Sequence, residues 1–540
     1  MDKPDENKRK CTGLDALFFS ALDSGVELVT GVPGYPITAL MERFLSETSA
    51  NENSCQFSGV EAKWLTNEKV ALELALGASA TGRRALVLVK HVGMNLLSDP
   101  LITSVTHTIG AGLVIVAGDD PGVKASQNEQ DSRWYGKLAE LAIFDPQDPD
   151  TAYRSLRRAY ALSEELKIPV ILRLTARLEE SRGKIKRFSP SKKPFSEFDP
   201  SIWGLRMREK HWHFHEKVYP RLEAEAENTD LNSFKAGRMQ IVGDVGASFE
   251  EVESEEESKI GVISSGFASA LVAEGLKNYP EVSQLSLNLV NPLPFKKIRT
   301  FLKKHEIILV AEESEPFIEE QLCITGKVRG KKTGHLPYGQ LLLEHLEFAL
   351  EHIKDLRVEK PFDAENAKAR KKSRTSICAS CAFLPLYHVL RQLDVWVAGD
   401  MGCSVRSAPK PLAAVDVSFA LGSAISVACG FKKKGIAVIG DFALAHSGIL
   451  GLMNAVQTGA EVLVLVLENQ VAAMTGGQKV PELQALVKIL VPDTLVYDLE
   501  GTKGNEEKKG KAELSDLIRA KLDQKGISVI FIRGKCTKYI

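Results

Sequence analysis

Two polar residue types follow two apolar runs of this sequence in an order that suits metal and phosphate binding. Gly440 and Asp441 end the run IAVI, and Asn469 follows the run VLVLVLE, 28 positions after Asp441. If both runs are strands of one parallel sheet, their carboxyl ends share the edge at which open sheets bind ligands. Mg²⁺ prefers carboxylate, amide and carbonyl oxygens. Although Gly-Asp after a strand is usually only a turn, the paired Asn469 favours a site at which Asp441, Asn469 and the main-chain carbonyl of Val471 hold Mg²⁺ and anchor a diphosphate.

The elements that must position these residues are short runs rich in Val, Ile and Leu, with helical patterns between them. Such runs are typical of parallel sheets that are buried on both faces. The sequence therefore predicts an α/β fold with several doubly wound parallel-sheet domains. The clearest strands are expected at residues 27–31, 85–90, 113–117, 170–174, 436–439 and 462–467, and the clearest helices at 68–80 and 150–166.

Length and local composition divide the chain into domains. At roughly 100–200 residues per domain, 540 residues suit three or four units. Many charges and the acidic run EEVESEEES predict a solvated, partly helical linker in the second quarter of the chain, and the basic stretch at 368–374 predicts a solvated loop. We predict an α/β domain at 1–182, a linker at 183–258, a smaller α/β domain at 259–355 and a last α/β domain at 356–540.

Charge and cysteine usage exclude several functional classes. The 69 Lys and Arg residues balance 70 Asp and Glu residues, so nothing favours a nucleic-acid or anionic-membrane surface. The amino-terminal MDKPDENKRK has no apolar signal core, and polar residues interrupt the longest apolar stretch, so we expect no membrane span. Eight scattered cysteines do not form a disulfide framework, and we expect a cytoplasmic protein.

Longer segments carry a resemblance to a known family. The segments GDFALAHSGILGLMNAVQTG and LENQVAAMTGGQ resemble the alpha subunit of indolepyruvate ferredoxin oxidoreductase, a thiamine diphosphate enzyme of the 2-oxoacid:ferredoxin oxidoreductase superfamily. Phe442 stands where many thiamine enzymes have a second glycine, which that family also lacks. Glu468 and Phe383 depart from the usual Asn and from the family's histidine. Since the resemblance spans nearly the whole chain, it implies a pyrimidine-binding domain, a transketolase C-terminal-like domain and a diphosphate-binding domain, in that order.

The resemblance also implies which residues bind thiamine diphosphate and Mg²⁺. The segments GVPGYPITAL, KHVGMN, ICASC and GDMGCSVRSAPKPLAAVD match the family, in addition to the two segments above. Carried over position by position, the cofactor-binding residues are Gly34, Tyr35, Pro36, Glu68, Asn95, Cys378, Cys381, Asp400, Gly402, Cys403, Gly440, Asp441, Phe442, His446, Asn469, Met474 and Thr475.

Two further residues of the first domain have implied catalytic roles. Thiamine chemistry needs a carboxylate that protonates the aminopyrimidine, and the segment WLTNEKVALEL places Glu68 at the start of a helix, where the family's activating glutamate falls. Without that match, Glu68 would be interpreted as a surface residue that complements the helix dipole. His91 is predicted to contact the substrate carboxylate or a developing charge, the alternative being a hydrogen-bonded structural histidine. Asn95, Gln127, Asn128 and Arg133 are predicted to line the pocket.

The cysteines bear on where electrons go. Family alpha subunits carry a ferredoxin-like tail with iron–sulfur clusters, whereas this sequence stops at GKCTKYI. Cys378, Cys381 and Cys403 are one thiol short of a four-cysteine site, and Cys536 is interpreted as a single thiol. We therefore expect no iron–sulfur cluster in this chain. Packed thiols are the preferred interpretation of Cys378 and Cys381, and metal binding or a redox disulfide are the alternatives.

Three functions remain in competition. The first is thiamine-dependent oxidative decarboxylation of a 2-oxo acid, an arylpyruvate such as indolepyruvate, to an acyl-coenzyme A. It requires a smaller beta- or gamma-type subunit and an iron–sulfur acceptor in trans, and we expect a homodimer at the thiamine sites. The second is a non-oxidative decarboxylase or carboligase, and the third is a regulatory or scaffold subunit without catalysis. The protein fixes which fate the cofactor's chemistry follows, and Glu68, Asp441 and Asn469 argue against the third.

Overall fold

The structure is a computed structural model that describes residues 8–50, 59–188, 198–237, 259–322, 326–359, 377–499 and 505–539. The chain forms two compact units, Met1–Asp363 and Ala364–Ile540, which are treated separately below. The predicted solvated loop at 368–374 and the acidic run at 249–258 lie outside the described residues.

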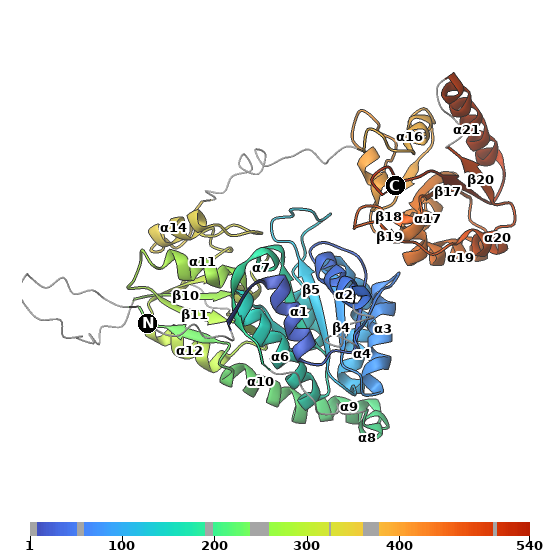
Figure 1. The fold of residues 1–540 in the computed structure, drawn as a ribbon. Helices are drawn as coiled ribbons and strands as arrows, with labels where there is room; N and C mark the ends of the chain where they lie inside the picture. Colours follow the sequence, from blue (N-terminus) through green and yellow to red (C-terminus); the bar gives the residue numbers. More distant parts are fainter. Residues whose placement is uncertain are drawn as a thin grey trace, which may run out of the picture. The chain divides into compact units, whose positions relative to one another are not determined.

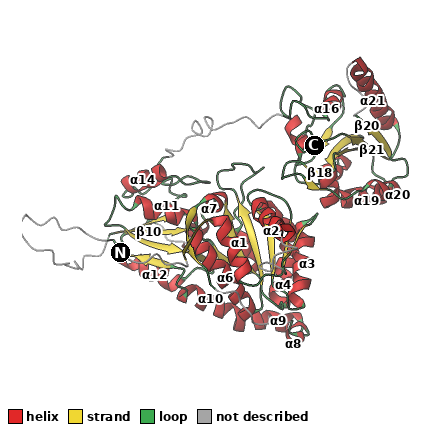
Figure 2. Cartoon of the chain, viewed as in Figure 1, coloured by secondary structure: helices red, strands yellow, loops and turns green. Residues whose placement is uncertain are grey.

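A seven-stranded sheet forms the larger part of the first unit (Figures 1 and 2). All neighbouring strands are parallel except the edge strand β12, which is antiparallel to β6. The central strands are continuously buried, because Val, Ile and Leu occupy both faces. The strands in spatial order are β12 (Leu289–Asn291), β6 (Ile143–Phe144), β7 (Val170–Thr175), β5 (Leu113–Asp119), β4 (Ala85–Lys90), β2 (Leu28–Gly31) and β3 (Glu61–Trp64).

Helices of this sheet pack in pairs, α1 against α6 and α3 against α4. Helix α6 begins with a capping box at Asp148 and buries one face, and α3 begins after Asn67, whose side chain accepts a hydrogen bond from the Lys69 amide at 2.9 Å. The helices are α1 (Gly13–Asp23), α2 (Thr38–Ala50), α3 (Glu68–Ala80), α4 (His91–His107), α5 (Arg133–Ala139), α6 (Pro149–Leu166) and α7 (Ala176–Glu180), and β1 (Lys8–Thr12) pairs antiparallel with β8 (Arg182–Lys186).

A second sheet of five strands completes the first unit. Its strands are parallel except β9, which is antiparallel to β11. In order they are β14 (Val328–Arg329), β13 (Ile307–Ala311), β10 (Ile260–Ser265), β11 (Ser283–Leu287) and β9 (Ser233–Lys235), with helices α11 (Phe267–Gly275), α12 (Phe295–Lys304), α13 (Phe317–Leu322) and α14 (Leu343–Glu351).

The predicted linker contains ordered elements in its described part. They are most of β8 (Arg182–Lys186), α8 (Pro200–Trp203), α9 (Met207–His213), the π-helical segment η1 (Phe214–Val218), α10 (Tyr219–Asn228) and strand β9. Phe214, Leu222 and Ala226 are buried, so this segment contributes to the core of the unit. In addition, β12 belongs to the first sheet although its residues fall in the predicted middle domain. The four domain boundaries stay a prediction.

The second unit is built on one fully parallel five-stranded sheet. Its strands in order are β15 (Val397–Gly399), β16 (Gly435–Gly440), β17 (Val462–Glu468), β21 (Ile527–Arg533) and β20 (Leu495–Asp498), and the short β18 (Val471–Ala472) and β19 (Gln478–Lys479) form a hairpin. The helical segments are α16 (Leu384–Leu390), η2 (Cys403–Ser407), α17 (Ala424–Cys429), α18 (Asp441–Ala443), η3 (Leu444–Gly448), α19 (Ile449–Thr458), α20 (Gln484–Leu490) and α21 (Asn505–Asp523).

These sheets confirm the predicted fold class, which is α/β with several parallel sheets. The strands expected at 85–90 and 462–467 and the helix expected at 68–80 differ from the observed elements by at most one residue. Among the described helices, none has the length and apolar content needed to cross a membrane.

Candidate active site

In the second unit, Asp441 and Asn469 lie at the carboxyl ends of neighbouring parallel strands. Strand β16 pairs with β17 up to Gly440 and Leu467, so the next residues of both strands meet at one edge. One carboxylate oxygen of Asp441 accepts hydrogen bonds from the main-chain amides of Asn469 and Gln470, at 3.0 and 2.6 Å. The other oxygen accepts one from the Phe442 amide at 2.8 Å. The structure thus brings together the two residues that the sequence separates by 28 positions.

The turn after β17 presents further oxygen atoms. The Asn469 side-chain oxygen accepts a hydrogen bond from the Val471 amide at 3.1 Å, which holds the amide group beside the chain reversal into the β18–β19 hairpin. Val471 is the first residue of that hairpin. An Asp carboxylate, an Asn amide and a main-chain carbonyl are therefore present at one strand edge.

The electrostatics of Asp441 fit a bound cation. Burial raises the pKa of Asp441 to about 6, although three main-chain amides oppose the rise. Within the described ranges, no Lys, Arg or His side chain forms an ion pair with it. A buried carboxylate without a cationic partner is costly, and a divalent ion would remove that cost. The residues present thus fit Mg²⁺ in the type of their donor atoms and in their unbalanced negative charge.

A second buried acid, Asp400, follows the adjacent strand β15. Its side chain accepts a hydrogen bond from the Gly422 amide at 2.5 Å, and Gly402 lies next to its other carboxylate oxygen. Burial raises the pKa of Asp400 to about 7, although the main-chain amides of Gly422 and Met401 and the nearby His446 oppose the rise. His446 belongs to the π-helical segment η3 between α18 and α19. Such segments are frequent at functional sites.

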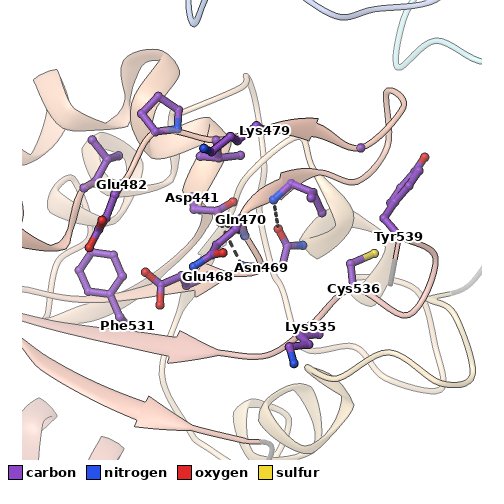
Figure 3. Close-up of a pocket in the computed structure, with 15 residues that line it drawn as sticks. Asp441, Glu468, Asn469, Gln470, Lys479, Glu482, Phe531, Lys535, Cys536 and Tyr539 are labelled. Atoms are coloured by element: carbon purple, nitrogen blue, oxygen red, sulfur yellow. Dashed lines mark hydrogen bonds between the residues drawn. The ribbon is translucent and has the colours of Figure 1, made fainter.

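A cavity of about 620 Å³ opens beside the Asp441 edge (Figure 3). Its lining includes Asp441, Asn469 and Val471, and also Lys535, Cys536 and Tyr539, which sequence reasoning did not select. Gly440, Phe442, Met474 and Thr475 are not among the lining residues. Thr475 donates a hydrogen bond to the Gln478 side chain at 3.0 Å within the hairpin loop, and Met474 is exposed.

Glu468, which departs from the family's usual Asn, has partners of its own. Its carboxylate accepts hydrogen bonds from Gln484 at 2.6 and 2.8 Å and from Arg533 at 2.9 Å. Arg533 is the last residue of β21, so this ion pair joins the ends of two adjacent strands beside Asn469. The departure at Glu468 is thus compensated locally.

Four cysteines of the second unit are closer together than the sequence suggested. Burial raises the pKa of the Cys403 thiol to about 11, and Cys381, Cys536 and Cys378 add to the rise, so all three lie within electrostatic range of it. The Ser380 and Thr537 hydroxyls hydrogen-bond at 3.0 Å, which joins the Cys378–Cys381 turn to the loop after β21. Cys536 is a free thiol near the Cys378–Cys381 turn, a proximity that the sequence did not indicate.

With Cys536 nearby, four thiols and not three lie in this part of the second unit, and the absence of a cluster was predicted from a count of three. Four cysteines match the ligand number of an iron–sulfur or closed zinc site. Within the described ranges, however, no three Cys, His, Asp or Glu side chains are placed to hold one metal ion. The absence of a cluster stays a prediction.

In the first unit, Glu68 is the first residue of α3 and only 6% exposed. A side chain at Gly93, in the first turn of α4, would come within 2.6–2.9 Å of the Glu68 side chain. The glycine therefore lets α4 approach the carboxylate closely. This burial differs from the surface position that a lone Glu at a helix start usually has.

His91 is fully buried at the start of α4. Its Nδ1 lies 3.3 Å from the Gly118 carbonyl oxygen and its Nε2 lies 3.1 Å from the Asn128 carbonyl oxygen. Since both ring nitrogens face main-chain oxygens, the geometry supports the structural alternative for His91. Asn95 is exposed and hydrogen-bonds with Tyr135 and, at 3.3 Å, with Gln130.

The Gly34-Tyr35-Pro36 turn follows the carboxyl end of β2. Because β2 is parallel to β3 and β4, the turn lies at the sheet edge from which the segments with Glu68 and His91 start. Gly34 is packed against the side chain of Lys90, the last residue of β4. The sequence interpretation did not include Lys90, although its place at a strand end is the signal that would have selected it.

Arg133 was predicted to line a pocket, but it is fully buried in an ion network. Its guanidinium pairs with Asp131 at 2.5 Å and with Glu312, which follows β13 of the second sheet, at 2.8 Å. Arg133 therefore joins the two sheets of the first unit, and that part of the prediction is wrong. Gln127 and Asn128 are exposed.

Comparisons with known proteins agree with this geometry. Residues 400–531, which include Asp400, Asp441 and Asn469, match the thiamine pyrophosphate enzyme, C-terminal TPP binding domain. The chain is 30% identical to the indolepyruvate oxidoreductase subunit IorA of Methanothermobacter thermautotrophicus, over 87% of this chain and 76% of the relative. It is 27% identical to the subunit IorA of Archaeoglobus fulgidus, over 97% of this chain and 86% of the relative.

A solved structure is also similar. It is a 2-oxoglutarate:ferredoxin oxidoreductase from Magnetococcus marinus, with a TM-score of 0.49 and 14% identity over 65% of this chain and 66% of that chain. The sequence matches, which extend over most of both chains, decide the assignment: this chain belongs to the family of the indolepyruvate oxidoreductase subunit IorA.

Proposed function

We propose that this chain is the thiamine diphosphate-dependent subunit of an enzyme that oxidatively decarboxylates a 2-oxo acid, an arylpyruvate such as indolepyruvate, to an acyl-coenzyme A. The observation that carries the proposal is the buried, cation-free Asp441 beside Asn469, within a segment that matches a thiamine diphosphate-binding domain. The relatives named indolepyruvate oxidoreductase support the substrate class.

Each proposed residue has a limited task. When bound, thiamine diphosphate supplies a nucleophilic carbon and an electron sink for decarboxylation. Asp441, Asn469 and the Val471 carbonyl would hold Mg²⁺ and with it the diphosphate. Glu68 would hold a proton against the aminopyrimidine, and its burial beside Gly93 suits a carboxyl group that exchanges a proton with a ligand and not with water.

The assembly and the electron path are part of the proposal. We infer that a smaller subunit and an iron–sulfur acceptor are supplied in trans, that coenzyme A takes the acyl group and that two copies of this chain meet at the thiamine sites. The names of the relatives describe a subunit, which supports a partner. The described cysteines are free thiols, as suits a cytoplasmic enzyme.

The test is anaerobic turnover of indolepyruvate by the chain, alone and with its partner subunit, in the presence of coenzyme A and a viologen dye. We expect dye reduction that requires thiamine diphosphate, Mg²⁺ and coenzyme A. Aldehyde release without any electron acceptor would instead support the alternative, a non-oxidative decarboxylase or carboligase. Iron and sulfide analysis of the chain purified without its partner tests the predicted absence of a cluster, and about four iron atoms per chain would contradict it.

A further inference from the structure

Lys90 is a half-buried cation at the sheet edge of the first unit. It is the last residue of β4 and directly precedes α4. Burial lowers the pKa of its ammonium group, and Asp120 opposes this only in part. Within the described ranges, no side chain or carbonyl forms an ion pair or hydrogen bond with the Lys90 ammonium. A cation in this state is costly unless an anion joins it.

The surroundings of Lys90 are built to keep it in place. A Cβ atom at Gly34 would lie 2.9 Å from Lys90 Cβ and 3.2 Å from Lys90 Cδ, so the lysine stem passes directly over the glycine backbone. The Gly34 turn is itself fixed, since its amide and carbonyl both hydrogen-bond with the Thr38 hydroxyl, at 2.9 and 3.0 Å. Any side chain at position 34 would displace the lysine.

Asp120, the acid that influences Lys90, is already occupied. Its carboxylate accepts hydrogen bonds from the main-chain amides of Lys124, Ala125 and Ser126, at 3.0, 2.8 and 2.9 Å. These bonds hold a loop that follows β5, so the carboxylate serves that loop and leaves the ammonium without a direct partner.

We propose that the Lys90 ammonium binds the carboxylate of the 2-oxo acid substrate. The inference rests on the proposed function, because Glu68 marks the place of the aminopyrimidine. Lys90 precedes the first turn of α4, and Gly93 of that turn contacts Glu68. A single ammonium acts as a compact point charge, which suits one carboxylate. The phosphates of coenzyme A are the competing anions.

The test compares two unreactive ligands of nearly the same shape, one charged and one neutral. Indolepropionate carries the substrate's carboxylate, and indolepropionamide has the same shape without the charge. Calorimetric dissociation constants are measured on the full chain loaded with thiamine diphosphate and Mg²⁺, together with its partner subunit. The variants are Lys90→Met, Lys90→Arg and, as a matched control, Lys277→Met, which removes an exposed lysine that pairs with Glu274 on the surface of the same unit.

We expect Lys90→Met to weaken indolepropionate binding about tenfold or more, the loss of one hydrogen bond between charged groups. Binding of the amide and of thiamine diphosphate should not change, Lys90→Arg should restore part of the affinity for the acid, and Lys277→Met should resemble the parent protein. The KM for indolepyruvate should rise in parallel, with the KM for coenzyme A unaffected.

Three outcomes would overturn the inference. They are equal losses for acid and amide, failure of the parent protein to bind indolepropionate more tightly than its amide, and a rise in the KM for coenzyme A alone. The last result would assign Lys90 to a phosphate. Failure of the proposed function is distinguishable, because then the parent protein itself would not turn over any 2-oxo acid.

Discussion

Two buried carboxylates, Asp131 of the first unit and Asp441 of the second, are in opposite electrostatic states. In the first unit, burial would raise the pKa of Asp131, but Arg133 and Arg173 outweigh it and lower the pKa to about 2. In the second unit, Asp441 has main-chain amides as partners, and its pKa rises to about 6. Both acids are buried, so burial alone does not mark a ligand site. The difference is that arginine side chains pair with Asp131, whereas the described partners of Asp441 are main-chain amides, which leaves its charge available to the Mg²⁺ that we propose.

The largest change in stability should follow from removing the arginine that pairs with Asp131. Arg133→Met leaves Asp131 and Glu312 buried without their direct ion-pair partner, and we expect the free energy of unfolding to fall by roughly 3–5 kcal/mol. Urea denaturation followed by circular dichroism measures it.

The matched control is Arg154→Met, which removes an arginine paired with the exposed Asp150 and Asp230. This variant should change the unfolding free energy by less than about 1 kcal/mol. Equal effects of the two substitutions would contradict the role assigned to the Arg133 network.

Asp441→Asn tests the second unit and should have the opposite effect, which is a loss of cofactor affinity without a loss of stability. We expect the dissociation constant for thiamine diphosphate, measured with Mg²⁺, to rise about 10-fold to 100-fold or more. The unfolding free energy of the cofactor-free chain should not fall, because the substitution removes an unbalanced buried charge. Asp416→Asn is the control, since Asp416 is an exposed acid of the same unit that hydrogen-bonds with the Val397 amide at 2.7 Å. Destabilisation by Asp441→Asn without loss of cofactor affinity would show that the two carboxylates are alike.

The pH dependence of stability and of cofactor affinity should show a smaller effect of Asp441. The pKa of Asp441 in the cofactor-free fold is about 6, above its ordinary value of 3.8, so its contribution to stability grows as the pH falls through 6 toward 4. Mg²⁺ needs the ionised form, so cofactor affinity should fall over the same range, by about tenfold per pH unit well below the pKa.

The Asp441→Asn variant distinguishes the titration of Asp441 from that of Asp400, whose pKa is raised to about 7. Calorimetry with Mg²⁺ and thiamine diphosphate between about pH 5 and 8 should show a weaker pH dependence in Asp441→Asn. An unchanged profile would mean that another group governs binding.

Sequence reasoning succeeded where a local pattern carries the structure. Short runs such as VLVLVLE, apolar on both faces and rich in Val, favour buried strands, so β17 and the edge at Asn469 were predictable. Arg133 was not, because its partner Glu312 is 179 positions away and nothing local distinguishes an arginine that binds a ligand from one that joins two sheets. Cys536 was missed for the same reason, since its proximity to Cys403 depends on a strand order that the sequence does not display. Lys90 lies in the segment KHVGMN, which resembles the family, but the sequence analysis assigned the substrate contact to its neighbour His91.

We propose above that Glu68 activates a cofactor that Asp441 and Asn469 hold. The most direct measurement is the rate of hydrogen–deuterium exchange at C2 of bound thiamine diphosphate in the assembled enzyme, followed by quenched-flow NMR, for the parent protein and Glu68→Gln. We expect the parent protein to accelerate exchange and Glu68→Gln to slow it by about 100-fold or more while binding the cofactor as tightly as before. Equal exchange rates in two proteins that both retain the cofactor would contradict it.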